Sequence, residues 1–111
     1  MDIIKIAAAA ADDKKARDLT ALDISAIASF ADRFLICTGD SSRQIQAISD
    51  EIETRLKEIG VRPNHVEGYQ NAEWVVMDYS DLIVHIFSKT ARAYYDIERL
   101  WRDAVTVDLN G

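Results

Sequence analysis

Two short apolar runs that are separated by only two residues most constrain the fold of this chain. Residues 74–79 read WVVMDY and residues 82–87 read LIVHIF. A gap of two residues between such runs is typical of an antiparallel β-hairpin with a tight turn. In that register Tyr79 lies opposite Leu82, and alternate residues along each strand point to opposite faces of the sheet.

The two faces of this predicted hairpin differ in composition. The first face carries only apolar and aromatic residues: Val75, Met77, Tyr79, Leu82, Val84 and Ile86. The second face carries Trp74, Val76, Asp78, Ile83, His85 and Phe87. The first composition is typical of a core. The second, which mixes large apolar groups with a carboxylate and an imidazole, is expected where a surface is exposed until a partner covers it.

The rest of the chain predicts helices and strands that extend this hairpin into a sheet. We expect helices over residues 3–16, 41–59 and 90–101, strands over 19–24 and 34–38, and a short extended piece within 61–69. The second helix is the clearest, because Ser41 and Gln44 form a capping box before apolar residues at intervals of three and four. In the last helix, Tyr94, Ile97 and either Leu100 or Trp101 are expected along one side.

This order of elements predicts one domain that spans residues 1–111. Its class is α/β or α+β, with a mixed five-stranded sheet that is flanked by helices and covered largely on one side. The continuous apolar run at residues 34–38 indicates a strand buried in the middle of the sheet. Residues 105–111 are expected to form a frayed tail.

Charge and cysteine content limit the partners of the protein. The 111 residues carry a formal net charge of −6, and from Glu67 onward eight acidic residues face four basic ones. This excess disfavours a nucleic-acid groove or an anionic membrane and favours a basic partner. Cys37 is the only cysteine, and neither a basic leader nor a run of about twenty apolar residues is present. We therefore predict a cytoplasmic protein without disulfides.

Three carboxylates raise an enzymatic alternative. Nucleotidyl transfer uses closely spaced carboxylates to hold divalent ions, and Asp40, Asp78 and Asp81 could supply them. Against this reading, residues 39–42 lack the glycines and lysine of a phosphate loop, and aspartates at turns commonly accept hydrogen bonds from local backbone amides. We therefore expect no catalytic residue, metal or cofactor, with a nucleotidyltransferase-like enzyme as the alternative.

His85 and the bulky aromatic residues are the other functional candidates. A catalytic pair of His85 with Asp78 lacks an accompanying nucleophile, which favours a hydrogen-bonded structural or interface histidine. The bulky aromatic residues near the hairpin and in the last helix are Trp74, Tyr94, Tyr95 and Trp101. Such residues often anchor protein interfaces, although for Tyr94 and Trp101 core packing explains the pattern equally well.

Three blocks of sequence carry a resemblance to a known family. Between Leu22 and Trp101 they read LDISAIASFADRFLICTGDSSRQIQAISDEIE, VEGYQNAEWVVMDYSDLIVHIF and ARAYYDIERLW. In this order they resemble the ribosomal silencing factor family, also known as Iojap-like proteins. The resemblance implies a small mixed α/β domain with the shape of a nucleotidyltransferase but without its catalytic site.

The resemblance also implies partners and a function. A member of this family is expected to be a homodimer when free and to bind a basic protein, of the L14 type, on the intersubunit face of the large ribosomal subunit. Bound there, it blocks joining of the small subunit and represses translation under nutrient limitation. Apolar burial and charge steering on an acidic, aromatic sheet face suit such a partner.

The resemblance places the family's functional residues on this chain by position. Its tryptophan corresponds to Trp74, and its tyrosine pair corresponds to Tyr94 and Tyr95. Two departures are Ser80, where many members have glycine in the turn, and Asp40, which replaces a hydroxyl residue. Together with the residue pattern, this predicts a partner-binding set of Trp74, Val76, Asp78, Tyr79, Asp81, His85, Tyr94 and Tyr95.

Overall fold

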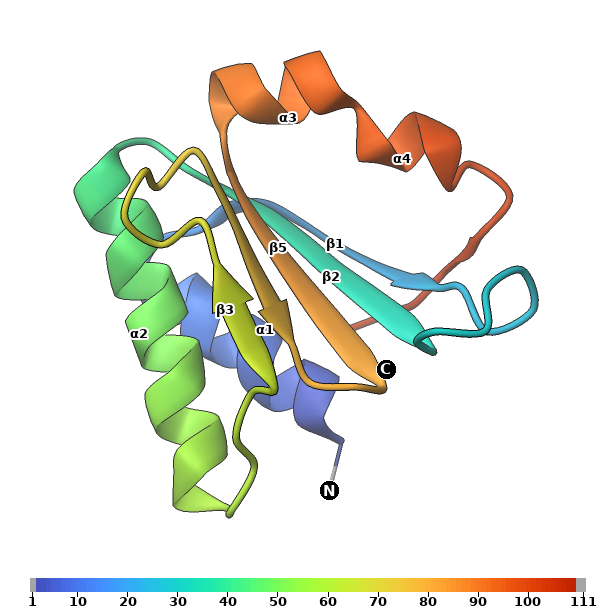
Figure 1. Ribbon diagram of the computed structural model, residues 1–111, viewed down its shortest axis with the longest axis horizontal. Coiled ribbons are helices and arrows are strands. Elements are labelled where there is room, and N and C mark those ends of the chain that lie inside the picture. Colours follow the sequence, from blue (N-terminus) through green and yellow to red (C-terminus); the bar gives the residue numbers. More distant parts are fainter. Residues whose placement is uncertain (1, 110–111) are drawn as a thin grey trace.

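A mixed sheet with helices on both faces forms the framework of the molecule (Figure 1). The computed structural model describes residues 2–109. In chain order the elements are α1 (Ile3–Asp13), β1 (Arg17–Asp23), β2 (Arg33–Gly39), α2 (Ser42–Glu58), β3 (His65–Glu67), β4 (Trp74–Asp78), β5 (Leu82–Ser88), α3 (Lys89–Tyr95), α4 (Ile97–Leu100) and β6 (Val105–Thr106). The predicted α/β or α+β class is confirmed, with one strand more than expected in the described residues.

The strand order is β3-β4-β5-β2-β1-β6. Only β2 and β5 are parallel, and all other described neighbours are antiparallel. The added strand is β6, whose Thr106 pairs with Leu22, while the amide of Val107 donates to Ala21. The prediction of a frayed tail from residue 105 is therefore wrong for residues 105–107, because backbone hydrogen bonds to β1 order them. Residues 110–111 of the expected tail lie outside the described residues.

The predicted hairpin register is confirmed. Trp74 pairs with Phe87, and Asp78 pairs with Ile83. Ser80 opens the turn with φ +72°, which tight hairpin turns require at their first position. The carboxylate of Asp78 accepts a 2.8 Å hydrogen bond from the Ser80 amide and thereby stabilises this conformation, as expected for an aspartate at a turn.

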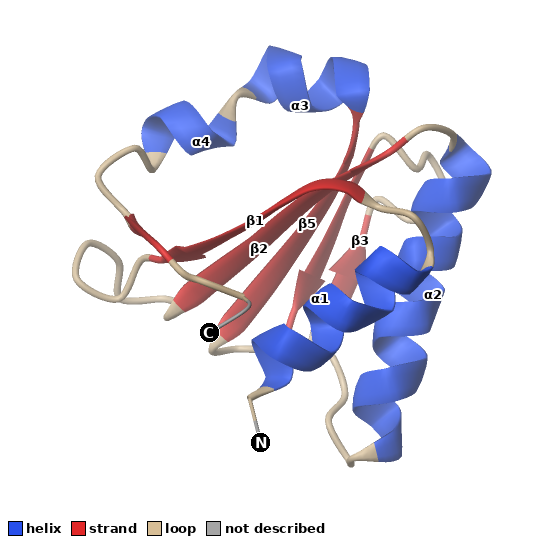
Figure 2. Cartoon of the chain, turned by 180° about the vertical axis from the view of Figure 1, so that it is seen from behind, coloured by secondary structure: helices blue, strands red, loops and turns tan. Residues whose placement is uncertain are grey.

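The first face of the hairpin packs against α1 and α2, which lie together on one side of the sheet, in front of it in Figure 2. All six residues predicted for this face are buried. Helix α2 begins after Ser41, whose hydroxyl oxygen accepts a hydrogen bond from the Gln44 amide, as the capping box predicts. Its buried residues recur at helical spacing and are Ile45, Ile48, Ser49, Ile52 and Leu56. The main core therefore lies between this helix pair and the sheet.

The second face is covered in part, by α3, α4 and the loop that joins β1 to β2. The expected continuous last helix is wrong, because Asp96 adopts a left-handed conformation with φ +47° and separates α3 from α4. The expected common side is wrong for Tyr94 and Leu100, whereas Ile97 and Trp101 pack into the same cluster. Ile97 is buried, whereas Tyr94 and Leu100 are 80% and 78% exposed. This break turns the tyrosines of α3 towards solvent while α4 still closes a second core.

Candidate protein-binding surface

Five side chains that are half-buried or exposed form a candidate surface on the second face of the sheet and on α3. We call it the aromatic contact surface, and it consists of Trp74, Val76, Asp78, Tyr94 and Tyr95. On β3, Glu67 pairs with Val76 and His65 pairs with Asp78, so these two exposed residues extend the same face. The surface is therefore apolar at its centre and acidic at its sheet edge.

Trp74 connects the sheet to α3. Its indole stacks on Phe87 with the ring centroids 5.0 Å apart, and it contacts the ring of Tyr95 at 4.7 Å. Tyr95 in turn meets Tyr94 edge to face at 5.0 Å. Edge-to-face and offset ring pairs are stabilising, so these contacts orient the exposed tyrosines relative to the sheet.

Arg92 holds α3 in position. Its side chain is 15% exposed, and its guanidinium donates two hydrogen bonds to the carboxylate of Glu98, at 2.8 and 3.1 Å. It also donates to the Asp18 carbonyl and the Thr38 hydroxyl, both at 2.9 Å. Asp96 follows Arg92 by four residues, the spacing of an ion pair in a continuous helix. The break at Asp96 instead brings Glu98 under the guanidinium, so one side chain links α3 and α4 to the sheet.

His85 is buried, at 7% exposure, so the expectation that it presents contact surface is wrong for the monomer. Its Nδ1 accepts a 3.1 Å hydrogen bond from the Trp74 indole, and its Nε2 has no hydrogen-bond partner among the described residues. Phe34 meets the ring edge to face at 4.6 Å. The catalytic pair of His85 with Asp78 is absent from the described contacts. Burial lowers the pKa of His85 to about 4.

This buried histidine predicts that acid destabilises the fold. The folded-state pKa lies below the ordinary 6.5, so as the pH falls the unfolded chain gains a proton before the folded one does. The free energy of unfolding should therefore be unaffected above about pH 6.5. The contribution of His85 to this free energy should fall by about 1 kcal/mol between pH 7.5 and 5.5, and by about 3 kcal/mol once the pH is below 4. Urea unfolding at several pH values measures this slope.

A His85→Leu variant provides the comparison for this pH effect. The aromatic side chains in contact with His85 are uncharged and are Phe34, Trp74 and Phe87. Removal of the imidazole should flatten the stability profile between pH 7.5 and 5.5. An equally steep profile in the variant would show that other groups cause the acid sensitivity.

Tyr79 is also interior. It is 6% exposed and lies on the core face, as the alternation predicted, so its place in the partner-binding set is wrong for the monomer. Its hydroxyl has no hydrogen-bond partner among the described residues, and burial together with the charge of Glu53 raises its pKa to about 12. The face assignment from the hairpin register was correct, because it placed Tyr79 on the core face.

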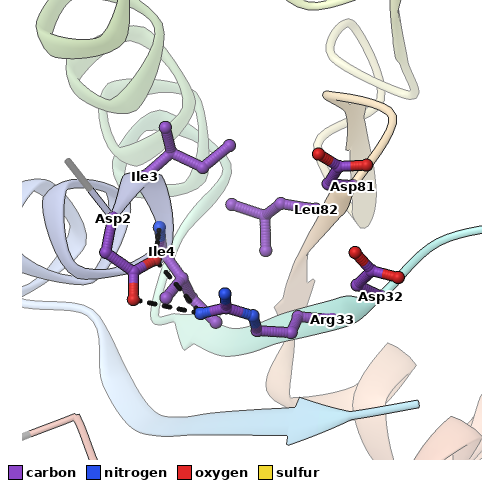
Figure 3. A pocket seen from close by; sticks show the side chains of 7 residues that line it. All are labelled: Asp2, Ile3, Ile4, Asp32, Arg33, Asp81 and Leu82. Atoms are coloured by element: carbon purple, nitrogen blue, oxygen red, sulfur yellow. Dashed lines mark hydrogen bonds and ion pairs between the residues drawn. The ribbon is translucent and has the colours of Figure 1, made fainter. Parts of the chain in front are cut away.

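Asp81 lies apart from the aromatic contact surface, at the beginning of β5. It lines a hollow between the start of α1 and the first residues of β2 and β5 (Figure 3). Asp32 lies beside it, and Arg33 crosses the hollow to form an ion pair with Asp2 at 3.1 Å. The hollow therefore presents two carboxylates next to an ion pair that fastens α1 to the sheet.

The three carboxylates of the enzymatic alternative do not meet. In the parallel pair of β2 and β5, Asp81 precedes the first residues and Asp40 follows the last. A seven-residue strand separates them, which is roughly 20 Å. Asp40 instead forms an ion pair with Arg17 at 2.9 Å. A two-metal site built from Asp40, Asp78 and Asp81 is therefore wrong, and the described residues contain no other group of His, Cys, Asp and Glu suited to a metal.

The sequence pattern missed part of the aromatic network. A continuous series of ring contacts runs through Phe30, Trp101, Phe34, His85, Trp74, Tyr95 and Tyr94. We call it the ring chain. Phe30, at its far end, is 58% exposed. An aromatic residue among the small residues of a loop was the available signal. Within residues 2–109 no helix has the length and apolar character needed to cross a membrane.

Comparison with known proteins adds an independent observation. Residues 1–111 match the family described as "Ribosomal silencing factor during starvation". The chain is 49% identical over 108 residues to Ribosomal silencing factor RsfS of Bacillus subtilis (strain 168), covering 97% of this chain and 92% of the relative. It is 32% identical over 94 residues to Protein Iojap-related, mitochondrial, of Arabidopsis thaliana, covering 80% and 50%. A crystal structure of a Chromobacterium violaceum protein matches with a TM-score of 0.88 and 40% identity, covering 91% and 87%.

Proposed function

Because this chain belongs to the ribosomal silencing factor family, we propose that it binds the large ribosomal subunit and prevents the small subunit from joining. The contact is with a basic protein of the L14 type on the intersubunit face. The bound protein represses translation under nutrient limitation by occupying space that the small subunit needs. The free protein is a homodimer that acts in the cytoplasm.

The observation that carries this proposal is the aromatic contact surface with its acidic edge. Tyr94 projects from α3 at 80% exposure, and Trp74 and Val76 remain half-buried on a face that no described element covers fully. Asp78 and Glu67 add negative charge beside them. Exposed aromatic anchors within a charged rim are the usual composition of a protein-binding surface, and the negative rim suits a basic protein.

Steric exclusion requires little more of the protein than binding at the right place. An interface of about 800 Å² per partner supports a specific complex, and a bound domain of this size then overlaps a competing subunit. Negative charge increases the rate of encounter with a basic surface, while apolar burial slows dissociation. The exposed apolar residues of α4 and of the β1–β2 loop, Leu100 and Phe30, support self-association of the free protein.

Subunit joining, followed by light scattering, tests the proposal. Purified small and large subunits are mixed with increasing amounts of the full-length protein, and joining should decrease until the large subunits are saturated. The protein should co-sediment with large subunits and not with small ones. Unchanged joining at saturating protein would contradict steric exclusion, and absence of co-sedimentation would contradict binding itself.

The Asp78→Asn variant tests the acidic edge. Asparagine retains an oxygen that can accept from the Ser80 amide, so the hairpin turn should persist while one negative charge is lost. We expect binding to large subunits to weaken by about threefold to tenfold, and the salt dependence to decrease, because rim charges act mainly on association. Glu58→Gln removes the same charge from the end of α2 and should leave binding unchanged. Equal effects of the two variants would exclude a local role for Asp78.

A further inference from the structure

His85 is a polar residue in an apolar environment, and the fold pays a free-energy cost for it. Its Nδ1 accepts a hydrogen bond from the Trp74 indole N–H, so the neutral ring carries its own proton on Nε2. That N–H group is buried and has no hydrogen-bond partner among the described residues. An unpaired buried donor destabilises a fold, whereas an apolar side chain of similar size at this position would carry no such penalty. Stability alone therefore does not account for a histidine here.

Among the described residues, the one side-chain hydrogen bond of this ring is the bond that its Nδ1 accepts from the Trp74 indole, at 3.1 Å. Tryptophan has a single polar atom, which can only donate. Without an acceptor below it, the half-buried indole would turn its N–H towards water. With the acceptor, the indole plane is held against Phe87 and against Tyr95, at 5.0 and 4.7 Å. The imidazole thus selects one orientation of the indole among those that the strand backbone permits.

We propose that His85 is a positioning residue, which holds the Trp74 indole and, through it, Tyr95 in the arrangement that a basic ribosomal partner recognises. This inference rests on the proposed function. It assigns to a buried imidazole a part in recognition that surface exposure alone does not reveal. Pre-organised aromatic side chains lose less conformational freedom on binding, so orientation of the indole before contact increases affinity.

Two substitutions separate positioning from packing. His85→Leu removes the Nδ1 acceptor and replaces the imidazole with an apolar side chain of similar size. His85→Asn removes ring contacts but can place its side-chain oxygen near the position of Nδ1. If His85 acts as the acceptor, His85→Leu should weaken binding to large ribosomal subunits by about tenfold, the effect of one hydrogen bond, and His85→Asn should restore much of it. The reverse order would show that ring packing is what binding requires.

The indole N–H resonance of Trp74 gives a readout that does not depend on the ribosome. Two-dimensional ¹⁵N–¹H spectra contain one indole signal for each of the two tryptophans, and Trp74→Phe identifies the signal of residue 74. We expect that signal to shift and exchange faster with water in His85→Leu, and to remain close to its original position in His85→Asn. The Trp101 signal serves as an internal reference. An unchanged Trp74 signal in His85→Leu would overturn the inference.

A double-mutant cycle completes the test. In a Trp74→Phe background the donor is absent, so His85→Leu should cause no further loss of binding if His85 acts through the indole. Additive losses would assign the effect to general packing and overturn the inference. If the unmodified protein fails to bind large subunits, the proposed function falls, and the indole spectra still decide whether His85 orients Trp74.

Discussion

Replacement of Trp74 by alanine is expected to weaken binding to the large ribosomal subunit by at least about thirtyfold, the scale of a central interface anchor. The indole contributes its own surface and also supports Tyr95, with which it is in ring contact at 4.7 Å. Its removal should therefore affect the two tyrosines of α3 as well. Sedimentation of the variant with large subunits measures the loss, and inhibition of subunit joining should decrease in parallel.

Trp101→Ala is the matched control for this experiment. It removes the same side chain from another part of the ring chain, where Trp101 contacts Phe30 and Phe34 at 5.8 and 5.2 Å. Both variants lose apolar packing, so both should lower the free energy of unfolding by a few kcal/mol. Only Trp74→Ala should show the large loss of binding while it remains folded. Comparable losses in both would move the contact surface towards α4 or indicate a general effect of stability.

Gly68→Ala is expected to be among the most destabilising single substitutions in the chain, by about 3 kcal/mol or more. A methyl group built on Gly68 would lie 2.1 Å from the carbonyl oxygen of Trp74. The obstacle is backbone of β4, which cannot rotate away as a side chain could. The residue also has φ +80°, a conformation that alanine adopts only at a cost. We therefore expect the β3–β4 connection and the orientation of Trp74 to be disturbed together.

Gly60→Ala separates the steric contact with β4 from the cost of a positive φ. Gly60 has the same φ of +80°, but a methyl group there would meet no atom within 4 Å. This substitution should cost only the conformational preference, about 1 kcal/mol. Urea unfolding of both variants measures the difference, which reports the steric contact with β4. If the two variants are equally stable, the close approach of Gly68 to Trp74 is relieved without significant cost.

Local patterns predicted the parts of the fold that depend on neighbours in sequence. The hairpin register followed from a two-residue gap and from the alternation of apolar residues, and the structure confirms it from Trp74 to Phe87. The start of α2 at Ser41 followed from its capping box. Alternation also assigned the buried face correctly. These features are set by turn geometry, strand periodicity and capping, which act over a few residues.

Features that depend on distant residues were not predictable in this way. The left-handed Asp96 divides the last helix because Arg92, which is held by the Asp18 carbonyl of β1 and the Thr38 hydroxyl of β2, draws Glu98 beneath it. The pairing of residues 105–107 with β1 likewise requires a strand more than eighty residues earlier in the chain. Neither arrangement leaves a periodic signal, because each depends on a tertiary contact.

The candidate surface likewise has features that local sequence predicted and features that depend on tertiary contacts. The sequence by itself determined which side chains share the second face of the hairpin, since a strand alternates its residues regardless of what lies above them. Only the tertiary structure decided which of them reach solvent. The packing of α3, α4 and the β1–β2 loop buries His85 and leaves Trp74 half-buried, because coverage of a sheet depends on where non-neighbouring elements dock and not on strand periodicity.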